Sequence, residues 1–204
     1  MLFRSAERPD LFHHNRLYHL MWNYKWVVTA AAANPRVSLE QVRLLEDGME
    51  SFFRSQGASM HTVHGQRYYV AVDLGLPDEA RAELAAWRAT PRDENSDCVA
   101  CDPERQVGAA RRAEDWELAV ATAVPVLRED VGCGEQPAGM QNLVLLPLLA
   151  SGRPRTAWEA HLRSYRRHRV NPRYTAPMGR HLEYLALSGH LVRSEEHTSE
   201  LQSP

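Results

Sequence analysis

Apolar residues along the chain recur at the three- and four-residue intervals of amphipathic helices, and Gly and Pro interrupt them at turns. Ser38 followed by Gln41 forms a capping box, and Asp102-Pro103 pairs an N-cap residue with a proline suited to a first helical turn. No segment shows the alternation typical of a strand. We expect helices near residues 10–33, 38–55, 59–74, 77–89, 102–113, 115–128, 137–151, 154–169 and 174–188.

One short pattern recurs along the chain, in which a turn residue is followed five positions later by alanine. Glycine at the turn can take the left-handed conformation that ends one helix, and alanine lets the next helix pack closely. Glu114 departs from the glycine rule. The turn positions lie 39, 38 and 37 residues apart and are Gly75, Glu114, Gly152 and Gly189. The three alanines that we expect to be buried are Ala80, Ala119 and Ala157.

The segment Leu74 to Ala80, which reads LG-x-x-x-EA, resembles the tetratricopeptide repeat. The family repeat is about 34 residues long, so these copies are slightly longer. The resemblance implies an all-α, right-handed solenoid of antiparallel helix hairpins over residues 6–192, with about four pairs and a truncated fifth. The segments around Cys98, Cys133 and His161 are also similar to repeat proteins common in streptomycetes.

Both ends of the chain look like translated sequencing adapter. Residues 193–204 contain RSEEHTSELQS, and residues 1–5 contain LFRS, which matches the opposite strand of the same adapter. Such segments are excluded from fold reasoning. We therefore expect residues 1–5 and 193–204 to be artefacts, and the natural segment to be a piece of a longer gene.

The resemblance also implies a binding surface, because the first helices of successive hairpins line a concave groove that holds a peptide. The alternative is that these positions are ordinary solvent-facing helix residues. The expected function is a scaffold that binds a protein or peptide partner. The positions placed on this face are Tyr69, Asp73, Glu104, Arg111, Arg112, Asn142 and Leu146.

Composition argues against several other functions. The formal net charge of -2 provides no field that would attract nucleic acid. The longest apolar run, Leu143 to Ala150, is too short for a membrane span. We find no catalytic motif that would support an enzyme. We expect a cytoplasmic protein without nucleic-acid partners.

The three cysteines, Cys98, Cys101 and Cys133, all fall in turns that join one expected hairpin to the next. Successive turns of this kind share one edge of a solenoid, so the thiols could converge on zinc, with His168, Asp97 or Asp102 as the fourth ligand. A reversible disulfide is a second interpretation, and tolerated loop cysteines are a third. The second functional hypothesis is therefore a zinc-stapled or thiol-switched regulatory module.

The five tryptophans occupy helical positions that we expect to face neighbouring helices. They are Trp22, Trp26, Trp87, Trp116 and Trp158. Core packing is the simpler explanation for them than a ligand-stacking role.

Overall fold

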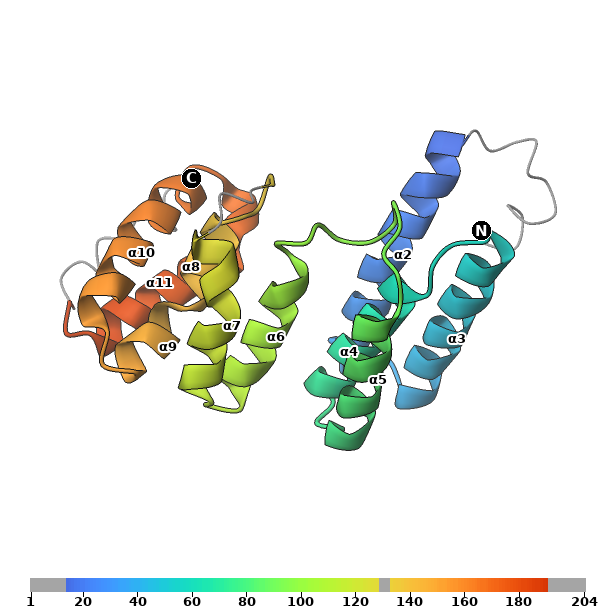
Figure 1. Ribbon diagram of the computed structural model, residues 1–204, viewed down its shortest axis with the longest axis horizontal. Helices are drawn as coiled ribbons and strands as arrows, with labels where there is room; N and C mark the ends of the chain where they lie inside the picture. Colours follow the sequence, from blue (N-terminus) through green and yellow to red (C-terminus); the bar gives the residue numbers. More distant parts are fainter. Residues whose placement is uncertain (1–13, 129–132, 191–204) are drawn as a thin grey trace. The chain divides into compact units, whose positions relative to one another are not determined.

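The computed structural model describes residues 14–128 and 133–190 of the chain. Both adapter-like ends therefore lie outside the described residues. The chain divides into two compact units, Met1–Asp97 and Cys98–Pro204. Every regular element in the described ranges is a helix, which confirms the expected all-helical fold (Figure 1). None of these helices combines the length and apolar character that crossing a membrane requires.

In its described residues, 14–97, unit 1 has four helices that enclose an apolar core. Its elements are α2 (His14–Ala32), α3 (Leu39–Ser55), α4 (His61–Asp73) and α5 (Pro77–Ala89). The predicted capping box starts α3, since the Ser38 side chain accepts from the Gln41 N–H and the Gln41 side chain accepts from the Ser38 N–H. Side chains of α2, α3 and α4 pack together around Val28, Phe53 and Val63.

The only lysine of the chain, Lys25, is buried on the inner face of α2. Its Nζ lies 2.7 Å from Asp97 Oδ1 and 3.3 Å from the centre of the Trp22 ring. A buried ammonium group is costly unless a carboxylate and further contacts compensate for the lost water. The ion pair therefore fixes the segment that closes unit 1 against α2.

The described part of unit 2 begins with α6 (Asp102–Arg112) and α7 (Trp116–Arg128), which are followed by further helices. The single helix expected over 137–151 is instead two short helices that meet at Val144. Pro147 explains the break, because it has no N–H to donate to the carbonyl of Leu143. The remaining elements are α8 (Ala138–Leu143), α9 (Leu145–Ala150), α10 (Pro154–His168), η2 (Pro172–Tyr174) and α11 (Thr175–Leu187).

The recurring turn positions all have the left-handed backbone conformation. The φ angles are 69° at Gly75, 71° at Gly152 and 82° at Gly189, and Glu114 also has a positive φ, of 55°. In each turn the next residue donates its N–H to a carbonyl five positions back, as at Leu76 to Ala71 (2.8 Å). This is the Schellman closure of a helix. Glu114 therefore follows the same turn geometry without being glycine.

Three of these turns each join two helical segments that pack against each other. The packed pairs are α4 with α5, α6 with α7, and α8–α9 with α10. The expected alanine contacts are present at Ala119 and Ala157, both fully buried. Ala80 was predicted to be buried but is only half-buried. Within unit 1, α5 packs against α4 and its one buried residue is Trp87, whereas α7 packs against α6, α8 and α9.

The tryptophan prediction was correct for Trp87, which is 4 % exposed and donates to His61 Nδ1 at 3.2 Å. It was wrong for Trp26, which is 51 % exposed. The buried face of α2 follows Met21, Lys25 and Val28, and Trp26 lies off that stripe. The other three tryptophans are half-buried, namely Trp22, Trp116 and Trp158.

Replacing Glu114 by glycine should stabilise unit 2. A non-glycine residue in the left-handed region costs about 1 kcal/mol, which glycine avoids. We expect Glu114→Gly to raise the free energy of unfolding by about 0.5 to 1 kcal/mol, measured by urea denaturation followed by circular dichroism.

The matched control is Gly152→Ala, at the equivalent turn of the next helix pair. No heavy atom lies within 4 Å of a Cβ added there, so only backbone strain should lower its stability. A loss of stability in Glu114→Gly would contradict the interpretation of this turn.

Candidate metal centre

The first two cysteines lie in the turn that leads into α6. The N–H groups of Cys101 and Asp102 both donate to the Cys98 carbonyl, at 2.8 and 3.2 Å. Ala100, between the cysteines, is buried, which anchors the turn on the core of unit 2. This local geometry places Cys98 Sγ 3.2 Å from Cys101 Sγ.

The third cysteine lies in the loop before α8, and neighbouring helices hold this loop. The Cys133 N–H donates to the Gln136 carbonyl at 3.3 Å, and the Glu135 N–H donates to Cys133 Sγ at 3.3 Å. The buried Gln136 side chain donates to Glu104 Oε2 on α6 at 2.6 Å. Arg167 on α10 donates to the carbonyl of Gly134.

The three sulfur atoms converge, as the sequence predicted. Cys101 Sγ lies 3.6 Å from Cys133 Sγ, and the sulfurs of Cys98, Cys101 and Cys133 all lie within 4.8 Å of one another. Zinc–sulfur bonds of about 2.3 Å require thiolates about 3.8 Å apart in a tetrahedral site. The donor set and its spacing therefore fit a thiophilic metal ion.

The fourth ligands proposed from the sequence do not complete this group. In the part of the chain that the structure describes, no His, Asp or Glu ligand atom joins the three sulfurs. Asp97 binds Lys25, and His168 lies in a separate histidine cluster. Asp102 starts α6 but its carboxylate is not among the converging atoms.

The surroundings of the thiols affect their pKa values differently. Burial raises the pKa of Cys133, but hydrogen bonds from the Glu135 and Gln136 backbone and from the Cys98 and Cys101 thiols together outweigh this effect, so the net pKa lies below its ordinary value. Burial and hydrogen bonds with Cys98 and Cys133 raise the pKa of Cys101. Cys133 is also the most exposed of the three cysteine residues. It is therefore the thiol best able to react as a thiolate.

The residues predicted to bind a partner have different environments. In unit 1, Tyr69 is half-buried and Asp73 is exposed. In unit 2, Arg111 pairs with Glu183, and Arg112 is exposed.

Asn142 is inaccessible to a partner in this structure. It is 1 % exposed, donates to the Pro177 carbonyl and accepts from Arg180, both at 3.0 to 3.1 Å. The resemblance to the tetratricopeptide repeat implied a place for Asn142 on the binding face, but α11 packs against α8 here.

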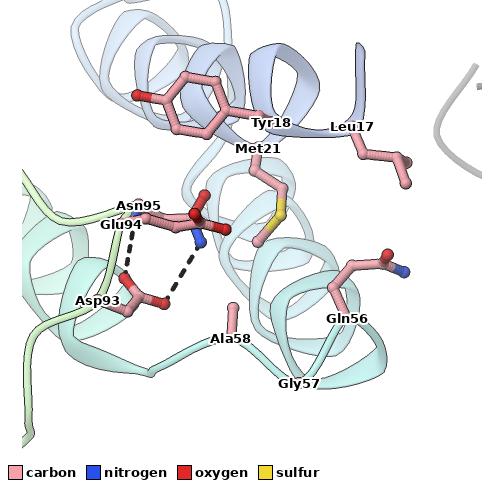
Figure 2. A pocket seen from close by; sticks show the side chains of 9 residues that line it. All are labelled: Leu17, Tyr18, Met21, Gln56, Gly57, Ala58, Asp93, Glu94 and Asn95. Carbon is pink, nitrogen blue, oxygen red and sulfur yellow. Dashed lines mark hydrogen bonds between the residues drawn. The ribbon is translucent and has the colours of Figure 1, made fainter. Parts of the chain in front are cut away.

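Unit 1 contains a pocket of about 440 Å³ that the sequence did not indicate. Figure 2 shows Asp93 accepting from the backbone and side chain of Asn95 beside this space. Asp93 also accepts from the Ser59 N–H at 2.8 Å, so its carboxylate holds the wall of the pocket together. The lining comes from three separate segments, Leu17–Met21, Gln56–Ala58 and Asp93–Asn95.

Comparison with known proteins adds no relative, since no family model, curated protein or solved structure matches the chain. The interpretation of the site therefore depends on its geometry.

Three histidines on α10 and α11 form a second buried cluster that the sequence did not predict. His161 Nδ1 lies 3.0 Å from His181 Nδ1, and His168 Nδ1 lies 3.4 Å from His181 Nε2. All three are at most 2 % exposed. Three neutral rings can satisfy both contacts, each with one donor and one acceptor. The cluster therefore suits uncharged imidazoles.

We expect acid to destabilise metal-free unit 2 through His168. Burial lowers the pKa of His168 to about 4, and the nearby Arg167 and Arg180 act in the same direction. The unfolded chain takes up this proton near the ordinary pKa of about 6.5. Stability should thus fall as the pH drops from about 6.5 towards 4, by about 2 kcal/mol at pH 5.

Urea denaturation at pH 7 and pH 5, with a chelator present, measures this loss. His168→Gln should reduce the pH dependence, leaving the contribution of His61 in unit 1, whose pKa burial also lowers. Equal stability of the parent protein at the two pH values would contradict the prediction.

Proposed function

We propose that this chain is a metal-stapled helical module in which Cys98, Cys101 and Cys133 bind one zinc ion. The convergence of three sulfur atoms from two segments 32 residues apart carries the proposal. Thiolates favour zinc among abundant divalent ions, and three protein ligands leave one coordination position for a water molecule or another external ligand.

The role of the ion is to join helix pairs. Cys98 and Cys101 belong to the start of the α6–α7 pair, whereas Cys133 belongs to the loop that starts the next pair. That loop also contacts η2, since Arg173 and Tyr174 bind the Glu135 carboxylate, both at 3.1 Å. A metal ion at the three sulfurs would therefore stabilise the junction between successive pairs.

We expect the purified protein to bind about one zinc per chain. Cys101→Ser should lower the zinc affinity by more than the roughly 10- to 100-fold that replacing an outer-shell residue costs. Competition with a chromophoric chelator measures the affinity, and metal analysis gives the stoichiometry. Asp102→Asn is the matched control, because its carboxylate lies next to Cys101 in sequence but outside the sulfur group.

Two results would contradict this function. One is that Cys101→Ser still binds zinc with the affinity of the parent protein. The other is that the parent protein binds no zinc and keeps its full helicity in the presence of a chelator.

A second candidate function is a scaffold for a protein or peptide, with the helix pairs continuing as a tetratricopeptide-like, right-handed solenoid. The repeated left-handed turns support it, because they generate helix pairs at a nearly constant period. Exposed apolar side chains on α2 also support it, namely Trp26 and Val27, at 51 % and 50 % exposure. Exposed aromatic residues often anchor protein partners. Both candidate functions consist of binding, of a metal ion or of a protein partner, rather than catalysis.

Selection of peptides from a displayed library tests the scaffold. If the face that includes Asp73 binds peptides, Asp73→Ala should lower the affinity for the selected peptides about tenfold, a loss of about 1.4 kcal/mol of binding free energy. Asp78→Ala, an exposed acidic residue on α5, is the control. Equal binding to both variants would argue against this face.

A further inference from the structure

The three cysteines whose sulfurs form a triangle differ in their exposure to solvent. Cys133 is exposed, whereas Cys98 and Cys101 are partly covered. The Glu135 N–H donates to Cys133 Sγ at 3.3 Å, which fixes this corner of the triangle in the loop before α8. An oxidant that arrives from solvent therefore meets Cys133 first.

Cys101 Sγ lies 3.6 Å from Cys133 Sγ. A disulfide needs about 2.05 Å between sulfurs, so this pair must close by roughly 1.5 Å. Cys133 lies in a loop, and Cys101 lies at the N-terminal end of α6, so the movement does not require a helix to shift.

We propose that a hydroperoxide oxidises Cys133 and that Cys101 resolves the product, so that a Cys101–Cys133 disulfide replaces the metal as the link between helix pairs. The two oxidation steps depend only on the exposure of the cysteines and the distances between their sulfur atoms. The metal-release step rests on the proposed function.

In the first step the Cys133 thiolate attacks the terminal oxygen of the hydroperoxide. A sulfur–oxygen bond forms, the oxygen–oxygen bond breaks, and the departing alkoxide or hydroxide takes a proton from solvent. Cys133 becomes a sulfenic acid.

In the second step the Cys101 sulfur attacks the Cys133 sulfur. The sulfur–sulfur bond forms, the sulfur–oxygen bond breaks, and the hydroxyl leaves as water with the thiol proton of Cys101. Two thiols have lost two electrons and the hydroperoxide has gained them. Cys98 remains a thiol.

The product has a structural consequence. A Cys98–Cys101 disulfide would close a turn of four residues and leave the loop before α8 unattached to it. A Cys101–Cys133 disulfide instead joins the same two segments that the metal joins. With one thiolate left, the ion loses its site, but the junction stays crosslinked.

Peptide mapping after treatment with hydrogen peroxide tests the proposal on the full chain. Metal-free and zinc-loaded proteins are oxidised in parallel, and the remaining thiols are alkylated before digestion. We expect a Cys101–Cys133 disulfide and one alkylated thiol, at Cys98, in both samples. The zinc-loaded sample should release about one zinc per chain, detected with a chromophoric chelator.

Variants identify the order of the steps. Cys101→Ser should accumulate a sulfenic acid at Cys133, trapped by dimedone, whereas Cys133→Ser should lose the fast reaction with peroxide. In the metal-free protein, Cys98→Ser should still form the Cys101–Cys133 disulfide, because Cys98 takes no part in either step. Circular dichroism checks that each variant is folded, and the map of the parent protein requires no variant.

The outcomes separate the two proposals. A Cys98–Cys101 disulfide with free Cys133 would overturn the inference even if zinc binds. Formation of the Cys101–Cys133 disulfide in a protein that never binds zinc would support the thiol chemistry and reject the metal site.

Discussion

The left-handed turn that closes the first helix of each pair is the constraint on which the rest of the structure depends. With a three-residue connection at Gly75 or Gly152, the second helix has to run back along the first. The segments that join one pair to the next then begin at the same end of each pair. In unit 2 this arrangement brings the turn before α6 and the loop before α8 together, and the thiols meet there.

The helix boundaries could be predicted because they depend on local chemistry. Ser38 and Gln41 satisfy each other's backbone groups whatever surrounds them, and Pro77 and Pro154 each begin a helix, as the sequence indicated. Glu114 shows the limit of local rules, since its residue type disfavours the turn that its place in the repeat requires. The repeat spacing predicted the turn at Glu114 better than its residue type did, because contacts along both helices outweigh about 1 kcal/mol of backbone strain.

The candidate site was only partly predictable from the sequence. The convergence of the cysteines followed from their place between helix pairs, without knowledge of side-chain contacts. The fourth ligand could not be assigned in this way, because the position of His168 depends on its contact with His181, 13 residues away on another helix. The burial of Lys25 could not be predicted either, because its partner Asp97 lies 72 residues further along the chain.

The three sulfurs and the histidine cluster are connected through two residues, Glu135 and Tyr174. Glu135 donates its N–H to Cys133 Sγ, and its carboxylate accepts from Tyr174, whose ring centre lies 4.8 Å from that of His168. The loop at Cys133 is therefore linked, through these contacts, to a buried imidazole whose pKa burial lowers. Because α10 and α11 share this cluster, the loop at Cys133 is coupled to both helices by direct contacts, and the proposed staple at the sulfurs would restrain the turn before α6, the loop before α8 and η2 together.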